Sequence, residues 1–125
     1  PELFATPEGR LLATFPDGSL VAPEKPARPG DIVILYGTGF GTTIRPTPGL
    51  ATSPDRVVNP SRFTIEIASN PLEPARLLYL GLTPGFAGLF QLNLALPPTT
   101  PPNPEIRVRT PAHDSRPNLY LPVQT

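Results

Sequence analysis

Proline and glycine dominate what this chain can fold into, since twenty-one prolines and ten glycines stand among its 125 residues. Proline lacks a backbone N–H and its ring clashes with the preceding helical turn, so recurrent prolines exclude long helices. The same composition also occurs in disordered chains. Here, however, hydrophobic residues make up 38% of the chain and charged residues only 16%, and the hydrophobic residues alternate in blocks. The composition therefore indicates a folded protein without long helices.

Charge and cysteine content exclude several function classes. Ten basic and ten acidic residues cancel, which leaves no electrostatic footprint for nucleic acid or for an anionic membrane surface. No cysteine is present, so disulfides, zinc–thiolate sites and thiol catalysis are excluded. No apolar run approaches the roughly 20 residues that span a bilayer, so we expect no membrane insertion. Because the chain contains no methionine, we interpret it as a segment of a longer polypeptide or as a processed form.

Hydrophobic alternation, with turn signals between the blocks, predicts a series of short strands. The first hairpin turns through Pro16, Asp17 and Gly18, where proline presets φ, Asp caps the turn and glycine takes a positive φ. Residues 31–36 are the most apolar and are expected at the centre of a sheet, whereas residues 41–61 predict a long surface loop. The predicted strands are residues 10–15, 20–22, 31–36, 62–67, 75–80, 89–96, 105–110 and 119–124, with at most a short strand near 56–58.

The number and spacing of these strands predict the fold class. Seven to nine short strands without a helix specify an all-β fold, an immunoglobulin-like antiparallel β-sandwich with Greek-key connections. The proline-dense connections at residues 23–29 and 97–104 suit crossings between two sheets. A chain of this length fits one domain, so we predict a single sandwich over residues 1–125. In it, the N-terminal hairpin and proline-rich link of residues 1–29 pack on a core formed by residues 30–125.

A glycine-rich run, Gly37-Thr38-Gly39-Phe40-Gly41, directly follows the predicted central strand. Dinucleotide-binding fingerprints also place glycines after a strand, but they need a helix there to hold the pyrophosphate. Residues 42–49 contain two prolines and cannot form that helix. We therefore assign the glycines a structural role at a bulge or sharp bend, and we predict no cofactor.

The sequence offers little catalytic chemistry. His113, Asp114 and Ser115 are consecutive, so their side chains diverge and cannot form a triad, in which one imidazole bridges two partners. We predict that they lie in a solvated loop. The single histidine excludes the usual zinc sites. The ten carboxylates form no local cluster, and a calcium site assembled from distant loops stays open. We predict that the protein is not an enzyme.

Few side chains are candidates for ligand contact. Arg107 and Arg109 share one strand face, which is typical of an exposed face or of a charged edge strand that discourages aggregation. Sugar-binding sandwiches usually present exposed Trp or Tyr, and this chain has no Trp and three tyrosines. Tyr36 and Tyr79 lie in core-like strands. Tyr120 is therefore the tyrosine that remains as a candidate for ligand contact.

Two stretches of the sequence resemble a known family. Residues 26–41 read PARPGDIVILYGTGFG, and residues 78–94 read LYLGLTPGFAGLFQLNL. They resemble the Solibacter-type C-terminal domain, a family of uncharacterised bacterial domains found at the carboxyl ends of long exported proteins. The opening residues 1–4 and the turn at residues 17–19 match that family as well. The glycine run alone is also shared with immunoglobulin-like transcription-factor-type (IPT/TIG) domains.

The resemblance implies an immunoglobulin-like fold and an extracellular or cell-surface location, and it transfers no catalytic residue. We expect Phe86 to plug one end of the sandwich at a glycine corner, and Gln91 and Asn93 to hydrogen-bond the backbone of a neighbouring loop. The family turns through a glycine pair after the strand at residues 63–67, whereas residues 68–74 here predict a longer loop. The motif residues with an assigned structural role are Gly37, Gly39, Gly41, Gly81, Pro84, Gly85, Phe86, Gly88, Gln91 and Asn93.

The leading functional prediction is a non-catalytic immunoglobulin-like module at the carboxyl end of a larger exported bacterial protein, where it serves as a spacer or as an adhesion and assembly domain. Its expected partners are other domains of the parent protein, or a cell-surface protein or glycan, contacted through strand edges or loops. We expect a monomer with no nucleic-acid partner. The alternative is a carbohydrate-binding module of a secreted protein, which requires an exposed aromatic side chain, such as Tyr120, beside polar groups.

Overall fold

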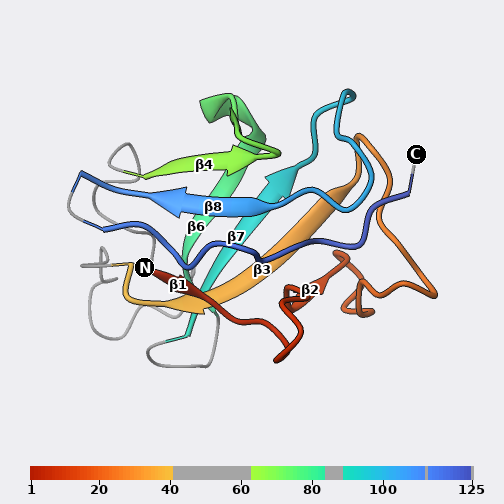
Figure 1. Cartoon of the computed structure of the whole chain (residues 1–125), viewed down its shortest axis with the longest axis horizontal. Coiled ribbons are helices and arrows are strands. Elements are labelled where there is room, and N and C mark those ends of the chain that lie inside the picture. The colour runs from red at the N-terminus through yellow and green to blue at the C-terminus, as the bar shows by residue number, and fades with distance from the viewer. Residues whose placement is uncertain (41–62, 84–88, 112, 125) are drawn as a thin grey trace, which may run out of the picture.

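The computed structural model describes residues 1–40, 63–83, 89–111 and 113–124, and this part of the chain forms an antiparallel β-sandwich (Figure 1). The predicted all-β fold is therefore confirmed, and eight strands lie within the described ranges. They are β1 (Glu2–Leu3), β2 (Ala13–Thr14), β3 (Ile32–Thr38), β4 (Thr64–Ile67), β5 (Asn70–Pro71), β6 (Leu77–Leu82), β7 (Phe90–Ala95) and β8 (Ile106–Arg109).

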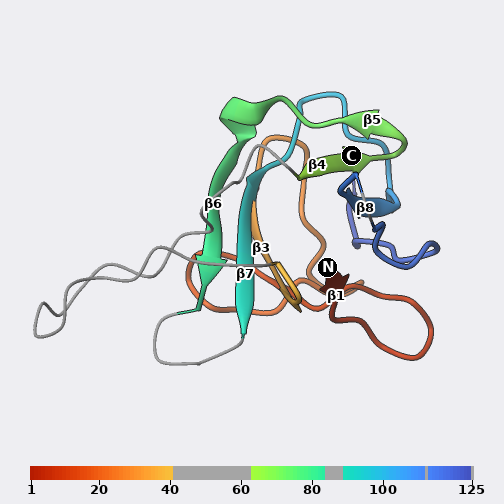
Figure 2. The ribbon, with the colours of Figure 1, turned by 90° about the vertical axis from the view of Figure 1, so that its left-hand side faces the viewer.

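The strands form two sheets that lie face to face, as Figure 2 shows in a view along their edges. The first sheet has the order β1-β3-β7-β6, with β2 also paired to β3, and the second has the order β5-β4-β8. The chain passes from one sheet to the other after β3, after β5 and after β7. The order of the first sheet is the A-B-E-D order of immunoglobulin domains, and the crossings are of the Greek-key kind.

The C-terminal segment, defined here as residues 119–124, extends the second sheet. Tyr120 forms an antiparallel bridge with Glu105 and a parallel bridge with Arg10, and Val123 forms a parallel bridge with Ala27. The predicted strand is nevertheless irregular, because Pro122 has no N–H to donate and the Val123 N–H donates to the Asn103 side chain at 3.3 Å. The segment is therefore held on both sides without a continuous ladder.

The core lies between the sheets and follows the predicted alternation. On β7, Phe90, Leu92 and Leu94 are buried, and on β4 the same is true of Ile65 and Ile67. The first 29 residues also contribute buried side chains, so the N-terminal part of the chain belongs to the same core. These contributions are Leu3, Leu11, Ala13, Val21 and Ala27.

The first hairpin has the predicted geometry. Thr14 and Leu20 form an antiparallel bridge, and Gly18 takes a φ of 89°. The Asp17 carboxylate accepts a hydrogen bond of 2.8 Å from the Ser19 N–H. A hydrogen bond from the Ser19 hydroxyl, together with this backbone bond, holds the pKa of Asp17 below its usual value. The turn is therefore fixed by local contacts that follow from the sequence.

A tight two-residue turn joins β4 to β5, so the predicted longer loop at residues 68–74 is wrong. Ile67 pairs directly with Asn70, and the two residues between them have positive φ angles, 52° at Ala68 and 69° at Ser69. Two successive positive φ angles define a type I′ turn, which ordinarily carries Asn and Gly. The absence of glycine suggested a longer loop, but the hydrogen bond from the Leu72 N–H to the Ile65 carbonyl imposes the turn.

The strand predicted at residues 75–80 begins later, because a single 3-10 turn, η2 (Pro74–Arg76), precedes β6. Pro74 stands at the start of this turn, where its missing N–H costs nothing, and the Arg76 N–H donates to the Glu73 carbonyl at 2.9 Å. No helix in the described ranges is long and apolar enough to cross a membrane. The loop predicted at residues 41–61, with its short strand, lies outside the described ranges.

Candidate functional site

The glycine run begins inside the central strand β3 and includes two positions, Gly37 and Gly39, that favour glycine for different reasons. Gly37 pairs with Leu3 of β1, and a Cβ atom at Gly37 would overlap the carbonyl oxygen of Glu2. Gly39 has a φ of 79°, which disfavours other residues. Gly37 therefore permits the close approach of β1 to β3, whereas Gly39 permits a left-handed backbone conformation. The motif residues Gly41, Pro84, Gly85, Phe86 and Gly88 lie outside the described residues.

Phe40 fills the space between the sheets near the end of β3. Its side chain is 1% exposed, and its ring centroid lies 5.4 Å from that of Phe63 and 5.5 Å from that of Phe90. We predicted such a plug at Phe86, which lies outside the described residues. The core position of Phe40 was not predicted, because Phe40 lies in a glycine run whose pattern indicates only a bend.

Gln91 and Asn93 lie on the outer face of the first sheet and are half-buried. The Gln91 Nε2 donates a hydrogen bond of 3.0 Å to the Asn93 Oδ1. We predicted bonds from both residues to a loop backbone, but in the described part of the chain the bond joins the two side chains. Residues two apart on one strand point to the same face, which makes this pairing direct. Gly81, also a motif residue, lies opposite Gln91 on β6.

The run His113-Asp114-Ser115 is only partly a solvated loop. His113 and Asp114 are exposed, but Ser115 is 1% exposed. The Ser115 hydroxyl accepts a hydrogen bond of 2.8 Å from the Val108 N–H, and the Ser115 N–H donates to the Val108 carbonyl. These bonds attach the run to β8, which buries the serine. The Ser115 hydroxyl is thereby committed to the backbone.

Charged side chains on the outer face of the second sheet pair with one another. The Arg109 guanidinium contacts the Glu66 carboxylate at 2.8 Å and the Asp114 carboxylate at 2.7 Å. The hydrogen bond that Arg109 donates to Glu66 is the main cause of a raised pKa at Arg109. Arg107 donates to the Ser115 carbonyl at 3.0 Å. Because β8 lies between β4 and the C-terminal segment, these arginines occupy an exposed face rather than an edge strand.

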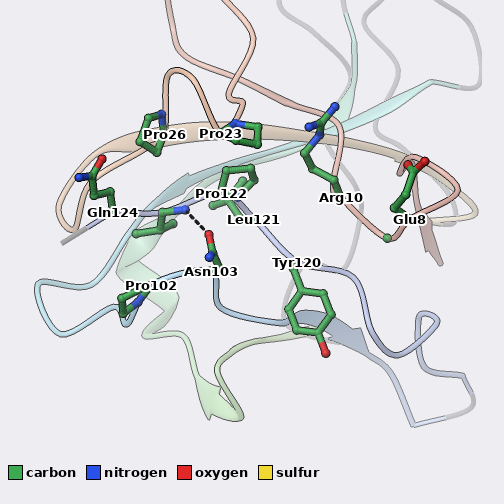
Figure 3. A pocket seen from close by; sticks show the side chains of 12 residues that line it. Glu8, Arg10, Pro23, Pro26, Pro102, Asn103, Tyr120, Leu121, Pro122 and Gln124 are labelled. Atoms are coloured by element: carbon green, nitrogen blue, oxygen red, sulfur yellow. Dashed lines mark hydrogen bonds between the residues drawn. The ribbon is translucent and has the colours of Figure 1, made fainter.

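A groove of about 600 Å³ opens along the C-terminal segment (Figure 3). Its size lies in the range of ligand sites in proteins. We call it the Tyr120 groove. The residues that line it come from the N-terminal part of the chain, from the connection before β8 and from the C-terminal segment: Glu8, Gly9, Arg10, Pro23, Pro26, Pro102, Asn103, Tyr120, Leu121, Pro122, Val123 and Gln124.

The Tyr120 groove lies where the pairing of the C-terminal segment is interrupted. Arg10 and Ala27 bridge to this segment, while residues 12–26 between them leave it to form the first hairpin. In Figure 3, Pro23, Pro26, Arg10 and Glu8 follow one side of the groove, and Asn103 and Tyr120 follow the other. The proline rings give this opening apolar walls, and none of them brings an N–H that needs a partner.

Polar groups stand at both ends of the Tyr120 groove. Tyr120 is 42% exposed, and its hydroxyl donates a long hydrogen bond of 3.4 Å to the Asn118 Oδ1. The Asn103 Oδ1 accepts the bond from Val123, and Asn103 is an exposed residue. The Glu8 carboxylate accepts a hydrogen bond from the backbone N–H of Glu8 and another from the Thr6 hydroxyl. These two bonds hold the pKa of Glu8 below its usual value. The groove therefore contains an ionised carboxylate beside the positive charge of Arg10.

A second hollow of about 430 Å³ adjoins the Tyr120 groove and shares Glu8 and Gly9 with it. Arg116 lines this hollow and forms an ion pair of 3.2 Å with Glu2. Together the two hollows follow the chain from residue 116 to residue 124. The sequence indicated only Tyr120 in this region, since Glu8, Arg10 and Asn103 come from distant parts of the chain.

In the described part of the chain, no three His, Asp or Glu side chains gather as metal ligands do. The described part of the chain is an antiparallel β-sandwich of immunoglobulin-like strand order, with the Tyr120 groove and an adjoining hollow on its surface. Comparisons with known protein families, with curated proteins and with solved structures find no match. The resemblance to the Solibacter-type C-terminal domain accordingly stays a prediction from the sequence.

Proposed function

We propose that this chain is a non-catalytic interaction module of a larger exported bacterial protein, and that it contacts its partner through the Tyr120 groove. The observation that carries the proposal is the exposed ring of Tyr120, 42% accessible, at the side of a groove of about 600 Å³. An exposed tyrosine in a concave site with a few polar groups is typical of recognition surfaces.

The walls of the groove are fixed before any partner arrives. The Tyr120 N–H donates to the Gly9 carbonyl and the Tyr120 carbonyl accepts from Leu11, both at 2.8 Å. At the other end, the Ala27 N–H donates to the Pro122 carbonyl at 3.0 Å. A preformed site avoids the entropy cost of ordering loops on binding. This geometry favours an adhesion or assembly role over a passive spacer.

The lining residues of the groove suit binding better than catalysis. Glu8 is the one carboxylate among them, whereas glycoside hydrolysis uses a pair of carboxylates across the scissile bond. The hydrogen bonds that lower the pKa of Glu8 also keep it ionised, which disfavours a role as general acid. The placement at the carboxyl end of an exported protein rests on the family resemblance in residues 26–41 and 78–94.

Two arrays test this proposal. The fluorescently labelled chain is applied to immobilised glycans and to immobilised peptides, and material exposed to the chain is then examined for cleavage by mass spectrometry. We expect retention on at least one array, loss of retention in Tyr120→Ala, and no cleavage. Cleavage of any array member would overturn the non-catalytic assignment. Equal retention of the wild-type and Tyr120→Ala chains, or none on either array, would overturn the groove as the contact site.

A further inference from the structure

We infer that the occupant of the Tyr120 groove is an uncharged linear glycan that lies along residues 116–124, an inference that rests on the proposed function. The shape of the surface gives the first argument. The groove of about 600 Å³ and the adjoining hollow of about 430 Å³ meet at Glu8 and Gly9. Two adjoining hollows offer room for several units of an extended chain, whereas a single sugar fills only part of one.

The apolar surfaces of the groove match the faces of sugar rings. A pyranose presents C–H groups on its flat faces and hydroxyls around its edge, so it stacks on an aromatic ring while its edge forms hydrogen bonds. Tyr120 offers such a ring, with its hydroxyl still near solvent, and the amphipathic character of tyrosine suits this contact. Pro23 and Pro26 extend the apolar wall on the opposite side (Figure 3).

The polar groups of the groove match the edges of sugar rings. Hydroxyls both donate and accept hydrogen bonds, so they need both kinds of partner. Arg10 and the amide nitrogen of Asn103 supply donors, the Glu8 carboxylate supplies acceptors, and the Gln124 amide supplies both. Among the described residues that line the groove, Glu8 and Arg10 carry opposite charges. In the adjoining hollow, Arg116 is paired with Glu2. These charges balance, which favours an uncharged chain over an acidic one.

The backbone of the C-terminal segment argues against an extended peptide. A peptide that adds a strand needs unpaired N–H and C=O groups along an edge. Here the Tyr120 N–H and C=O bond to Gly9 and Leu11, the Leu121 N–H bonds to Pro104, and the Gln124 N–H bonds to Ala27. Binding in this groove therefore depends on side chains, which favours a ligand rich in hydroxyls.

Calorimetric titration of the 125-residue chain tests the inference. The probes are cello-, xylo-, manno- and chito-oligosaccharides, each as a disaccharide and as a hexasaccharide. We expect at least one series to bind, with the hexasaccharide at least about tenfold tighter than the disaccharide because both hollows are filled. The affinity should change little between low and physiological salt, because the charges of Glu8 and Arg10 balance.

Variants locate the binding. Tyr120→Ala should weaken hexasaccharide binding at least about tenfold, as the loss of a stacking anchor does, and Tyr120→Phe should retain most of it. Leu78→Ala is the matched control, since Leu78 is 43% exposed on β6 and does not line the groove. Thermal unfolding of each variant verifies that the fold is kept.

The outcomes separate the two proposals. Failure of all four series, equal affinity for disaccharide and hexasaccharide, or unchanged binding in Tyr120→Ala would overturn the glycan inference. If a peptide from the array binds in a Tyr120-dependent manner while every glycan fails, the glycan inference is wrong and the interaction module stands. If no peptide and no glycan depends on Tyr120, the proposed function fails as well.

Discussion

At Gly37 two strands come so close that no side chain fits between them. β3 pairs with β1 at this residue, and a Cβ atom would overlap the Glu2 carbonyl oxygen. The sequence predicted a structural role for this glycine from its place after a strand. The physical reason, close approach rather than a positive φ, depends on the pairing of residues 2–3 with 37–38, and no local pattern reveals a pairing across that distance.

Gly37→Ala should therefore destabilise the protein. The added methyl group would push β1 away from β3, and overpacking of this kind costs about 1 to 3 kcal/mol. Urea unfolding measures the free energy of unfolding, with Thr38→Ala on the exposed neighbouring residue as the control. A loss below about 0.5 kcal/mol, the range of ordinary surface substitutions, would contradict the close approach.

Among the elements, β7 was predicted correctly from the sequence pattern, whereas the β4–β5 hairpin was not. In residues 89–96, apolar Phe90, Leu92 and Leu94 alternate with polar Gln91 and Asn93. The burial along β7 (Phe90–Ala95) has the same alternation, because one face of the strand lies against the core. The β4–β5 turn was mispredicted because Ala68 and Ser69 adopt positive φ angles that tertiary pairing imposes against their local preference. Alternation is a local signal, whereas a strained turn depends on what its flanking strands contact.

The strained turn gives a stabilising prediction. The double substitution Ala68→Asn and Ser69→Gly places the favoured type I′ pair at these positions. It should raise the free energy of unfolding by about 1 kcal/mol, because a left-handed conformation costs non-glycine residues about that much or more. Urea unfolding is again the measurement. Ala95→Gly in β7, outside the residues with positive φ, should instead lower stability. An equal decrease in the free energy of unfolding in both variants would show that the turn is unstrained.

For the whole molecule, the C-terminal segment joins the N-terminal part of the chain to the second sheet. Leu119, Leu121 and Val123 are buried, and backbone bonds run from the segment to Gly9 on one side and to Pro104 on the other. This arrangement also creates the Tyr120 groove. The sequence could not predict the groove, because its lining residues are brought together only when both ends of the chain pair.

A chain that ends at Asn118 should fail to fold. Each of the three buried side chains of the segment contributes about 1.5 to 3 kcal/mol, and their sum is comparable with the total stability of a small domain, about 5 to 15 kcal/mol. The dispersion of amide signals in a two-dimensional NMR spectrum reports the fold. Tyr120→Ala, which removes an exposed side chain from the same segment, should keep this dispersion. A well-dispersed spectrum from the shortened chain would refute this role of the segment.

The central claim is that the Tyr120 groove is the contact site of an immunoglobulin-like module, and amide chemical-shift mapping tests it most directly. Cello-, xylo-, manno- and chito-hexasaccharides are added in turn to the isotope-labelled chain. The account predicts shifts concentrated in residues 8–10, 103 and 120–124, which line the groove. Shifts concentrated instead on the outer face of the first sheet, around Gln91 and Asn93, would contradict it, whereas no shifts with any of the glycans would contradict the glycan inference alone.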